Sequence, residues 1–285
     1  MVFTKNHNLF EILSFPMEKI IFDPKKHKYY VGEEKEEYPS VTTILNKVIA
    51  KPYLMYWAVK EAVSYIGENL DRVINKEIIL NSENAVKILN EAKKTHEKIR
   101  DEAGEIGKET HSIIEKINNH EVLDEKQMEK LDKRIRNSVN AYLFWKKQVG
   151  FEPEKSEFIC YSKKHKFAGK IDCVGKINNE LVIVDFKTTN AIYPEYWLQV
   201  AGYYGAFSEM FPDEKIKGCY IVRFGKEDGE EFEAKNIEDM VLMEENFKVF
   251  LSAVDLWEWQ TKQKEKEKEN KRKRKKGGEI KNDRK

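Results

Sequence analysis

The stretch FAGKIDCVGKINNELVIVDFK, residues 167–187, decides the fold of this chain. Two runs rich in apolar and β-branched residues are separated by Asn178 and Asn179. Asparagine tolerates the positive φ that two-residue hairpin turns require. The pattern therefore predicts a β-hairpin in which Ile177 faces Glu180.

In that register Asp172 and Asp185 lie directly opposite each other, with Cβ atoms about 4.5–5.5 Å apart. Lys187 points to the same face as Asp185, because side chains alternate along a strand. Apposed carboxylates destabilise a sheet unless positive charge offsets their repulsion, and a divalent cation held by oxygen ligands does so. Solvated carboxylates on an open hairpin face are the alternative, but the apolar residues around Asp185 favour a metal site.

Four elements in this order resemble the PD-(D/E)XK nuclease superfamily. The closest likeness is to its RecB-type branch, which includes CRISPR-associated, mitochondrial genome-maintenance and phage exonucleases. The matching positions are Gly107, His111 and Glu115 on an upstream helix, Gly169 and Asp172, then Asp185, Phe186 and Lys187, and finally Gln199 and Tyr203. Ile171 stands where the superfamily's literal signature has proline, as in the RecB-type variant.

The resemblance implies a set of site residues. His111, Asp172, Asp185 and the backbone carbonyl of Phe186 would hold one or two Mg²⁺ or Mn²⁺ ions, and imidazole suits Mn²⁺ at least as well as Mg²⁺. Lys187 would orient or deprotonate the attacking water, or stabilise the phosphorane electrostatically.

Further positions would support these groups. The resemblance places Gln199 and Tyr203 in the catalytic set, where they position Lys187 or a phosphate. Glu115 would hydrogen-bond to the residues that bind the metal, or would contact the metal through a water molecule. Thr188 would donate a hydrogen bond to phosphate or continue the strand.

The cysteines argue against an iron–sulfur cluster, which some RecB-type relatives hold with four cysteines. Cys160, Cys173 and Cys219 occur singly in strand-like runs, and three scattered thiols cannot ligate such a cluster within one chain. We expect three small buried side chains in a reducing compartment.

The periodicity and the resemblance together predict an α/β protein. We expect a restriction-endonuclease-like αβββαβ core, with a mixed central sheet flanked by helices and an N-terminal helical elaboration. One nuclease domain would span 1–260, with the elaboration over 1–100 and the catalytic core over 101–260. The expected core elements are helices over 84–118 and 124–148, a strand over 156–162, the hairpin, a helix over 194–210, a strand over 216–224 and a helix over 238–260.

Residues 261–285 carry 13 Lys or Arg against 5 Asp or Glu, although the whole chain has a net charge of only +1. The segment holds a single aliphatic residue, Ile280, so we expect a basic tail that cannot stay folded alone. Alternating Lys and Glu residues in its first part favour an extension of the preceding helix. A solubilising tail is one interpretation. In a nuclease we favour contact with DNA phosphates through the basic run Lys271, Arg272, Lys273, Arg274, Lys275 and Lys276.

The resulting hypothesis is a metal-dependent DNA exonuclease acting on single-stranded ends in recombination, repair or replication. A structure- or sequence-specific endonuclease on the same core is the alternative, and a non-cleaving nucleic-acid binder is the alternative of another class. A charged fraction of 35% and no apolar run of the ~20 residues that a membrane span needs argue against a membrane protein. The N-terminal sequence lacks a signal-peptide pattern, so we expect an intracellular, cytoplasmic protein, in the host cytoplasm if phage-encoded, that is not secreted.

Overall fold

The computed structural model describes residues 19–24 and 28–282, and within these ranges it leaves out the side chains of Glu125 and of residues 274–282. The elements in chain order are β1 (Ile20–Asp23), β2 (Lys28–Val31), β3 (Glu36–Tyr38), α1 (Val41–Val48), α2 (Pro52–Ile74), α3 (Ser82–Asn118), α4 (Glu125–Lys130), α5 (Lys133–Val149), β4 (Glu152–Ser162), β5 (Phe167–Ile177), β6 (Glu180–Lys187), α6 (Glu195–Met210), β7 (Gly218–Phe224), β8 (Phe232–Ile237) and α7 (Met240–Asn282).

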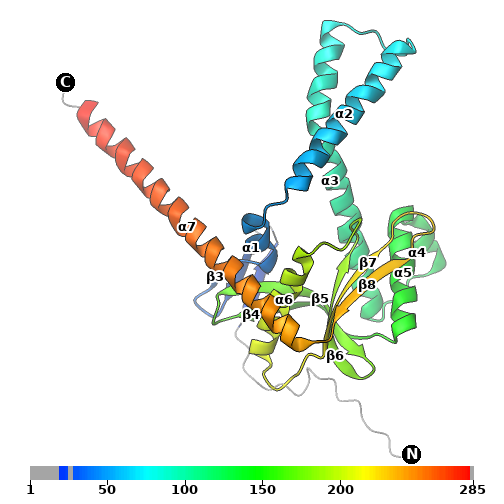
Figure 1. The fold of residues 1–285 in the computed structure, drawn as a ribbon, viewed down its shortest axis with the longest axis vertical. Helices are drawn as coiled ribbons and strands as arrows, with labels where there is room; N and C mark the ends of the chain where they lie inside the picture. The colour runs from blue at the N-terminus through cyan, green and yellow to red at the C-terminus, as the bar shows by residue number, and fades with distance from the viewer. Residues whose placement is uncertain (1–18, 25–27, 283–285) are drawn as a thin grey trace, which may run out of the picture.

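A five-stranded mixed sheet with the order β4-β5-β6-β7-β8 forms the centre of the fold (Figure 1). The pairs β4–β5, β5–β6 and β7–β8 are antiparallel, whereas β6 and β7 are parallel and are connected through α6. Two parallel neighbouring strands need such a crossover, because the chain must return to the starting end of the sheet before the second strand begins. This arrangement confirms the predicted α/β fold with a restriction-endonuclease-like core.

Helices cover both faces of this sheet. One apolar cluster joins the sheet to α1, α6 and α7, and includes Val200, Phe207 and Phe250. A second cluster joins the opposite face to α3 and α5, with Tyr142 and Trp145 at its centre. The sheet is therefore the middle layer of three, and the ends of its strands are held between helices from distant parts of the sequence.

The hairpin has the predicted register. Ile177 pairs with Glu180, and Cys173 pairs with Val184. Asn178 and Asn179 both have positive φ, 52° and 64°, as a two-residue turn between right-twisted strands requires. The same register, continued by one residue, sets Asp172 across from Asp185.

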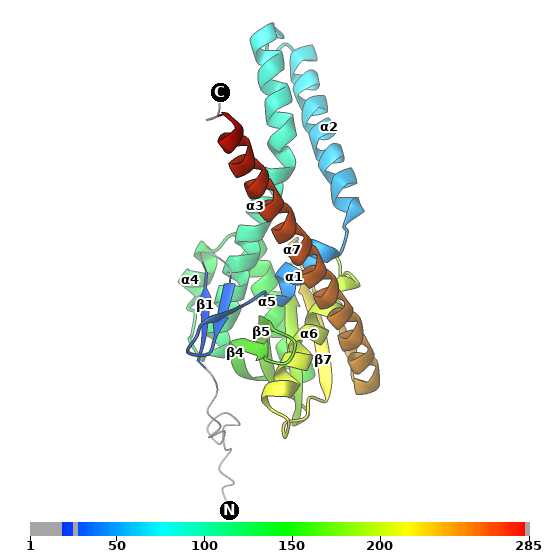
Figure 2. The same ribbon diagram turned by 90° about the vertical axis from the view of Figure 1, so that its left-hand side faces the viewer.

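The N-terminal elaboration has two parts. The small sheet β1-β2-β3 packs on β4 and β5 through Tyr29, Tyr38 and Tyr161. The helices α2 and α3 then form a long antiparallel arm that stands away from the sheet (Figures 1 and 2). The C-terminal half of α3 returns to the core, so one 37-residue helix links the arm to the sheet.

The predicted helix over 124–148 is wrong in one respect, because the structure has two helices there. Helix α4 ends at Lys130, and α5 begins after Asp132, whose carboxylate accepts a hydrogen bond from the backbone N–H of Arg134. This cap satisfies a free helix N–H group and starts a new helix. Strand β8 was also not predicted, because its sequence FEAKNI carries the charges of an edge strand rather than an apolar run.

Helix α7 passes the expected helix end at residue 260 and continues through the basic segment to Asn282. Ion pairs four residues apart support this extension, including Lys262–Glu258 at 3.0 Å and Lys273–Glu269 at 2.6 Å. Such pairs stabilise a helix that has no core to pack against. Residues 283–285 lie outside the described residues, and so do the side chains of Arg274, Lys275 and Lys276. Within the described residues, no helix combines the length and the apolar character needed to cross a membrane.

Candidate active site

The two apposed carboxylates lie where β5 and β6 meet α6. The side chain of Asp172 is 14% exposed, and that of Asp185 is fully buried. The backbone N–H of Phe186 donates a 2.8 Å hydrogen bond to Asp172 Oδ2. The pair is therefore held by the hairpin itself, and one carboxylate is anchored to the backbone beside the other.

Lys187 neutralises the buried carboxylate. Its Nζ lies 2.5 Å from Asp185 Oδ2 and donates a 3.3 Å hydrogen bond to Gln199 Oε1. A buried carboxylate needs such a partner, because an isolated charge in a protein interior is strongly unfavourable. The repulsion between Asp172 and Asp185 is therefore offset in part by a side chain of the protein itself, in addition to the divalent cation that the sequence predicts.

Gln199 connects the lysine, the carboxylate and α6. Its Nε2 donates to Asp185 Oδ1 at 3.1 Å and to the hydroxyl of Tyr203 at 2.9 Å. The charges fix the amide orientation, because the carbonyl must face the ammonium and the NH₂ group must face the carboxylate. Tyr203 packs so closely on Gly169 that a Cβ there would lie 2.6 Å from the ring, so the glycine admits the tyrosine.

His111 reaches the site from α3. Its Nδ1 lies 3.6 Å from Asp172 Oδ1, and its ring meets Phe186 edge-on at 6.4 Å between centroids. One turn earlier, a Cβ on Gly107 would lie 3.0 Å from Thr188 Oγ1. The absent side chain therefore lets α3 approach the end of β6.

Glu157 is a member of the site that sequence reasoning missed. His111, Glu157 and Asp172 each offer a potential ligand atom, and these atoms lie within 4.8 Å of one another. Glu157 has a φ of +53° and forms an ion pair with Lys170. Glu115, which the resemblance favoured, lines the same cavity but is not part of this group.

A bulge explains why Glu157 was missed. The pairing of β4 with β5 shifts by one residue between Pro153 and Lys155. Beyond the shift, Ser156 pairs with Cys173 and Phe158 pairs with Ile171, which sets Glu157 opposite Asp172. A one-residue slip moves every following side chain to the other face of the sheet. We find no sequence signal that places this bulge.

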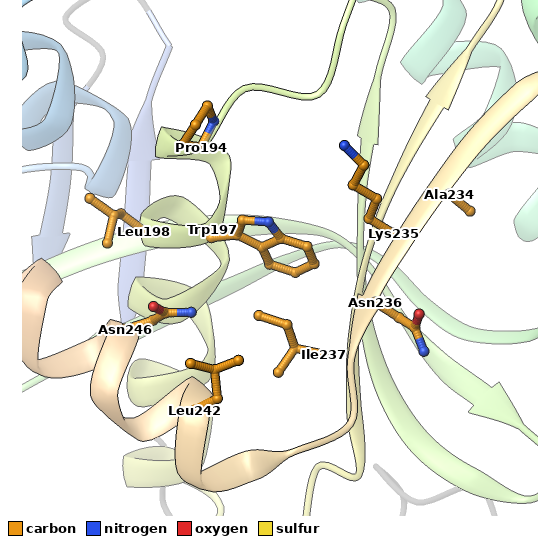
Figure 3. A pocket seen from close by; sticks show the side chains of 9 residues that line it. All are labelled: Pro194, Trp197, Leu198, Ala234, Lys235, Asn236, Ile237, Leu242 and Asn246. Carbon is orange, nitrogen blue, oxygen red and sulfur yellow. The ribbon is translucent and has the colours of Figure 1, made fainter.

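These groups line one cavity of about 1380 Å³, which extends from the carboxylates to the base of the arm. His111, Asp172, Lys187, Thr188, Gln199 and Tyr203 all contribute to its walls. A second groove of about 680 Å³ lies between α6, β8 and α7, where Trp197 stands over Ile237 (Figure 3). Its described lining holds no carboxylate and none of the predicted site residues.

Comparison with known families identifies the fold and the chemistry. Residues 83–276, well over half of the chain, match the family described as the PD-(D/E)XK nuclease superfamily. The chain belongs to this superfamily. It is therefore a hydrolytic nuclease with a nucleic-acid substrate.

Solved structures with similarity include an alkaline exonuclease from Laribacter hongkongensis, at 16% identity and a TM-score of 0.30, covering 45% of this chain and 70% of that one. The protein SSO0001 matches at 12% identity and a TM-score of 0.26, over 44% of this chain and 61% of that one. No curated protein sequence matches.

PD-(D/E)XK nucleases use divalent metals, and the donor set of this member fits one. His111, Glu157 and Asp172 provide one imidazole and two carboxylates within a small volume. Among the described residues, the buried Oδ2 of Asp185 accepts no well-aligned hydrogen bond, although Lys187 Nζ lies close to it. Carboxylate oxygens with one imidazole suit Mg²⁺ and Mn²⁺.

The charges of the site are strongly coupled. Burial raises the pKa of Asp185 to about 6, against the opposing effect of Lys187. Burial would also raise the pKa of Asp172, but His111, Lys187 and the backbone N–H of Phe186 together outweigh burial and lower that pKa. Burial would lower the pKa of His111, yet the charge of Asp172 raises it above 6.5. In the metal-free nuclease, the protonated His111 thus stabilises the folded state beside Asp172.

This coupling predicts a pH-dependent effect of His111→Gln. The folded-state pKa of His111 is raised, so its stabilisation is complete below pH 6.5 and is lost as the pH rises through the folded pKa. At pH 6 with EDTA, the variant should have a free energy of unfolding lower by up to about 1 kcal/mol. The difference should shrink with increasing pH in urea titrations. His96→Gln, on the same helix outside the site, is the control, and a pH-independent difference for His111→Gln would contradict the coupling.

Proposed function

We propose that the chain is a divalent-metal-dependent DNA exonuclease that acts on single-stranded ends. The observation that carries the proposal is the group of Asp172, Asp185 and Lys187, which Gln199 joins to the buried Asp185 at the wall of one cavity. In a protein that only binds DNA, apposed carboxylates next to the DNA would weaken binding, because they repel its phosphates. Recombination, repair or replication are the processes that require this activity.

The metal ligands in this proposal are His111, Asp172, Asp185 and the backbone carbonyl of Phe186. Glu157 joins them, because its carboxylate lies within 4.8 Å of the His111 and Asp172 ligand atoms. Bound Mg²⁺ or Mn²⁺ would supply a Lewis acid that lowers the pKa of water and neutralises charge on the phosphate. Glu115 and Thr188 line the cavity behind these groups.

Lys187 acts as a fixed cation in the proposed mechanism. Burial would lower its pKa, but the charges of Asp185 and Asp172 outweigh burial and raise it. The amine is therefore protonated at neutral pH and suited to stabilise negative charge on the phosphorane, rather than to take a proton from water. Gln199 holds Lys187 in place, and Tyr203 holds the Gln199 amide.

The position of the arm supports action at a strand end. Lys51, just before α2, and residues of α2 and α3, among them Trp57 and Arg100, line the cavity. The arm extends away from the core at this end, as Figure 2 shows. We propose that it restricts the approach of intact duplex and favours a free, unpaired end.

Linear and covalently closed circular single-stranded DNA test this function. With Mn²⁺ or Mg²⁺, the protein should degrade the linear strand and leave the circle intact, as resolved on denaturing gels. Asp185→Asn should reduce degradation to background, whereas Glu180→Gln, at the far end of the same strand, should retain it. Cleavage of the circle would establish an endonuclease. Binding without cleavage of either substrate would establish a non-cleaving binder.

We propose that the basic end of α7 contacts phosphates. Lys271, Arg272 and Lys273 are exposed on this helix, and the sequence continues the basic run to Lys276. Contact through counterion release makes affinity fall with salt in proportion to the number of phosphates neutralised.

Replacing all six basic residues from 271 to 276 with glutamine should weaken binding of single-stranded DNA at low salt. The slope of log affinity against log salt should become shallower by up to about 4. Fluorescence anisotropy in EDTA measures this slope without cleavage. Equal slopes for the two proteins would show that the run does not touch DNA and is a solubilising segment.

A further inference from the structure

Aromatic side chains gather at the end of the cavity next to the arm. Tyr53 and Trp57 come from the first turns of α2, and Tyr193 and Tyr196 come from the entry to α6. All four line the same cavity as the carboxylates. None of them belongs to the motifs that identify the superfamily, so the proposed chemistry does not account for them.

Tyr53, Tyr193 and Tyr196 form a continuous path to the catalytic centre, whereas the ring of Trp57 meets His96 edge-on at 6.3 Å. Tyr53 and Tyr193 stack nearly parallel, with centroids 5.5 Å apart and an interplanar angle of 9°. Tyr193 meets Tyr196 edge-on at 5.6 Å. The ammonium of Lys187 then lies 4.7 Å from the centre of the Tyr196 ring. A strand with a phosphate at Lys187 would therefore have its neighbouring bases beside aromatic surface.

The four rings are partly accessible, although Tyr196 also packs against the core. Tyr53 is 40% exposed, and Trp57, Tyr193 and Tyr196 are half-buried. Water-exposed aromatic faces in a cavity offer stacking surface to any planar ligand. Tyr56, on the same helix, is 74% exposed but does not line the cavity.

The described lining of the cavity holds more basic than acidic side chains. Its acids, Glu115, Glu157 and Asp172, belong to the end that we assign to metal. Among its bases, Lys51 lies just before α2, and Arg100 and Lys108 lie on α3, where they pair with Asp101 and Glu105. One acid lies close to the rings, Glu195. Its carboxylate is held by Lys51 at 3.5 Å and by the hydroxyl of Tyr53 at 3.4 Å, so its charge is compensated locally.

We infer that Tyr53, Trp57, Tyr193 and Tyr196 form a stacking site for the unpaired bases of the DNA strand being degraded. The inference rests on the proposed function and specifies its substrate: the ligand is single-stranded and is held by its bases as well as by its phosphates. Stacking of bases on aromatic side chains next to cationic groups is sequence-tolerant, because every base has an aromatic face. A processing nuclease needs that tolerance.

An abasic oligonucleotide separates stacking from phosphate contact, since it keeps the phosphates and lacks the bases. Binding is measured by fluorescence anisotropy in EDTA, with the full chain and without cleavage. Tyr53→Ala and Trp57→Ala should each weaken binding of a normal single strand about 5- to 150-fold. Both should bind the abasic strand as the unchanged protein does. Tyr53→Phe should retain the normal affinity, because it removes only the hydroxyl that contacts Glu195.

Tyr56→Ala is the matched control, because it removes an equally large exposed ring from the same helix outside the cavity. It should leave both affinities unchanged, and circular dichroism confirms that each variant keeps the helical arm. Equal losses on normal and abasic strands, or no loss for Tyr53→Ala and Trp57→Ala, would overturn the stacking site.

The binding assay and the degradation assay together distinguish failure of this inference from failure of the exonuclease proposal. Base-dependent binding in a protein that leaves linear DNA uncut would retain the stacking site and reject the activity. Degradation of linear DNA with no difference between normal and abasic strands would reject the stacking site alone.

Discussion

The buried ion pair between Lys187 and Asp185 is the interaction on which the site depends. Both side chains lie at one end of β6 beside Gln199, and Asp185 has no contact with solvent. A buried carboxylate without a partner would cost several kcal/mol. The lysine and the amide of Gln199 offset that cost, so the fold can hold a buried carboxylate opposite Asp172.

The surrounding packing brings distant segments to this pair. Gly107 lets α3 approach the end of β6, and that approach delivers His111 to Asp172. Gly169 in turn admits the ring of Tyr203, which fixes the Gln199 amide from α6. The two glycines have no chemical role, yet each permits a close contact that positions a functional group. The chemistry and the packing are therefore specified by the same few residues.

Much of this arrangement could be predicted from the sequence, because a two-residue turn determines strand register. Asn178 and Asn179 fixed the hairpin, and the register then placed the two aspartates opposite each other. The position of Glu157 in the site could not be predicted, because it depends on a β-bulge that no residue pattern in the sequence indicates. The alternating Lys and Glu residues after residue 260 favoured an extension of the preceding helix. The length of that extension could not be predicted, because ion pairs along one helix stabilise it without a core. The aromatic path likewise joins segments that lie far apart in the sequence.

Anomalous scattering from crystals of the metal-free protein soaked in Mn²⁺ tests whether the carboxylates bind metal. We predict a single- or double-ion peak between the carboxylates of Asp172 and Asp185, with His111 in direct coordination and Lys187 outside it. The absence of a peak at saturating Mn²⁺, with Lys187 still paired to Asp185, would contradict the claim. It would show that the buried carboxylates serve the stability of the sheet and not the binding of a catalytic metal.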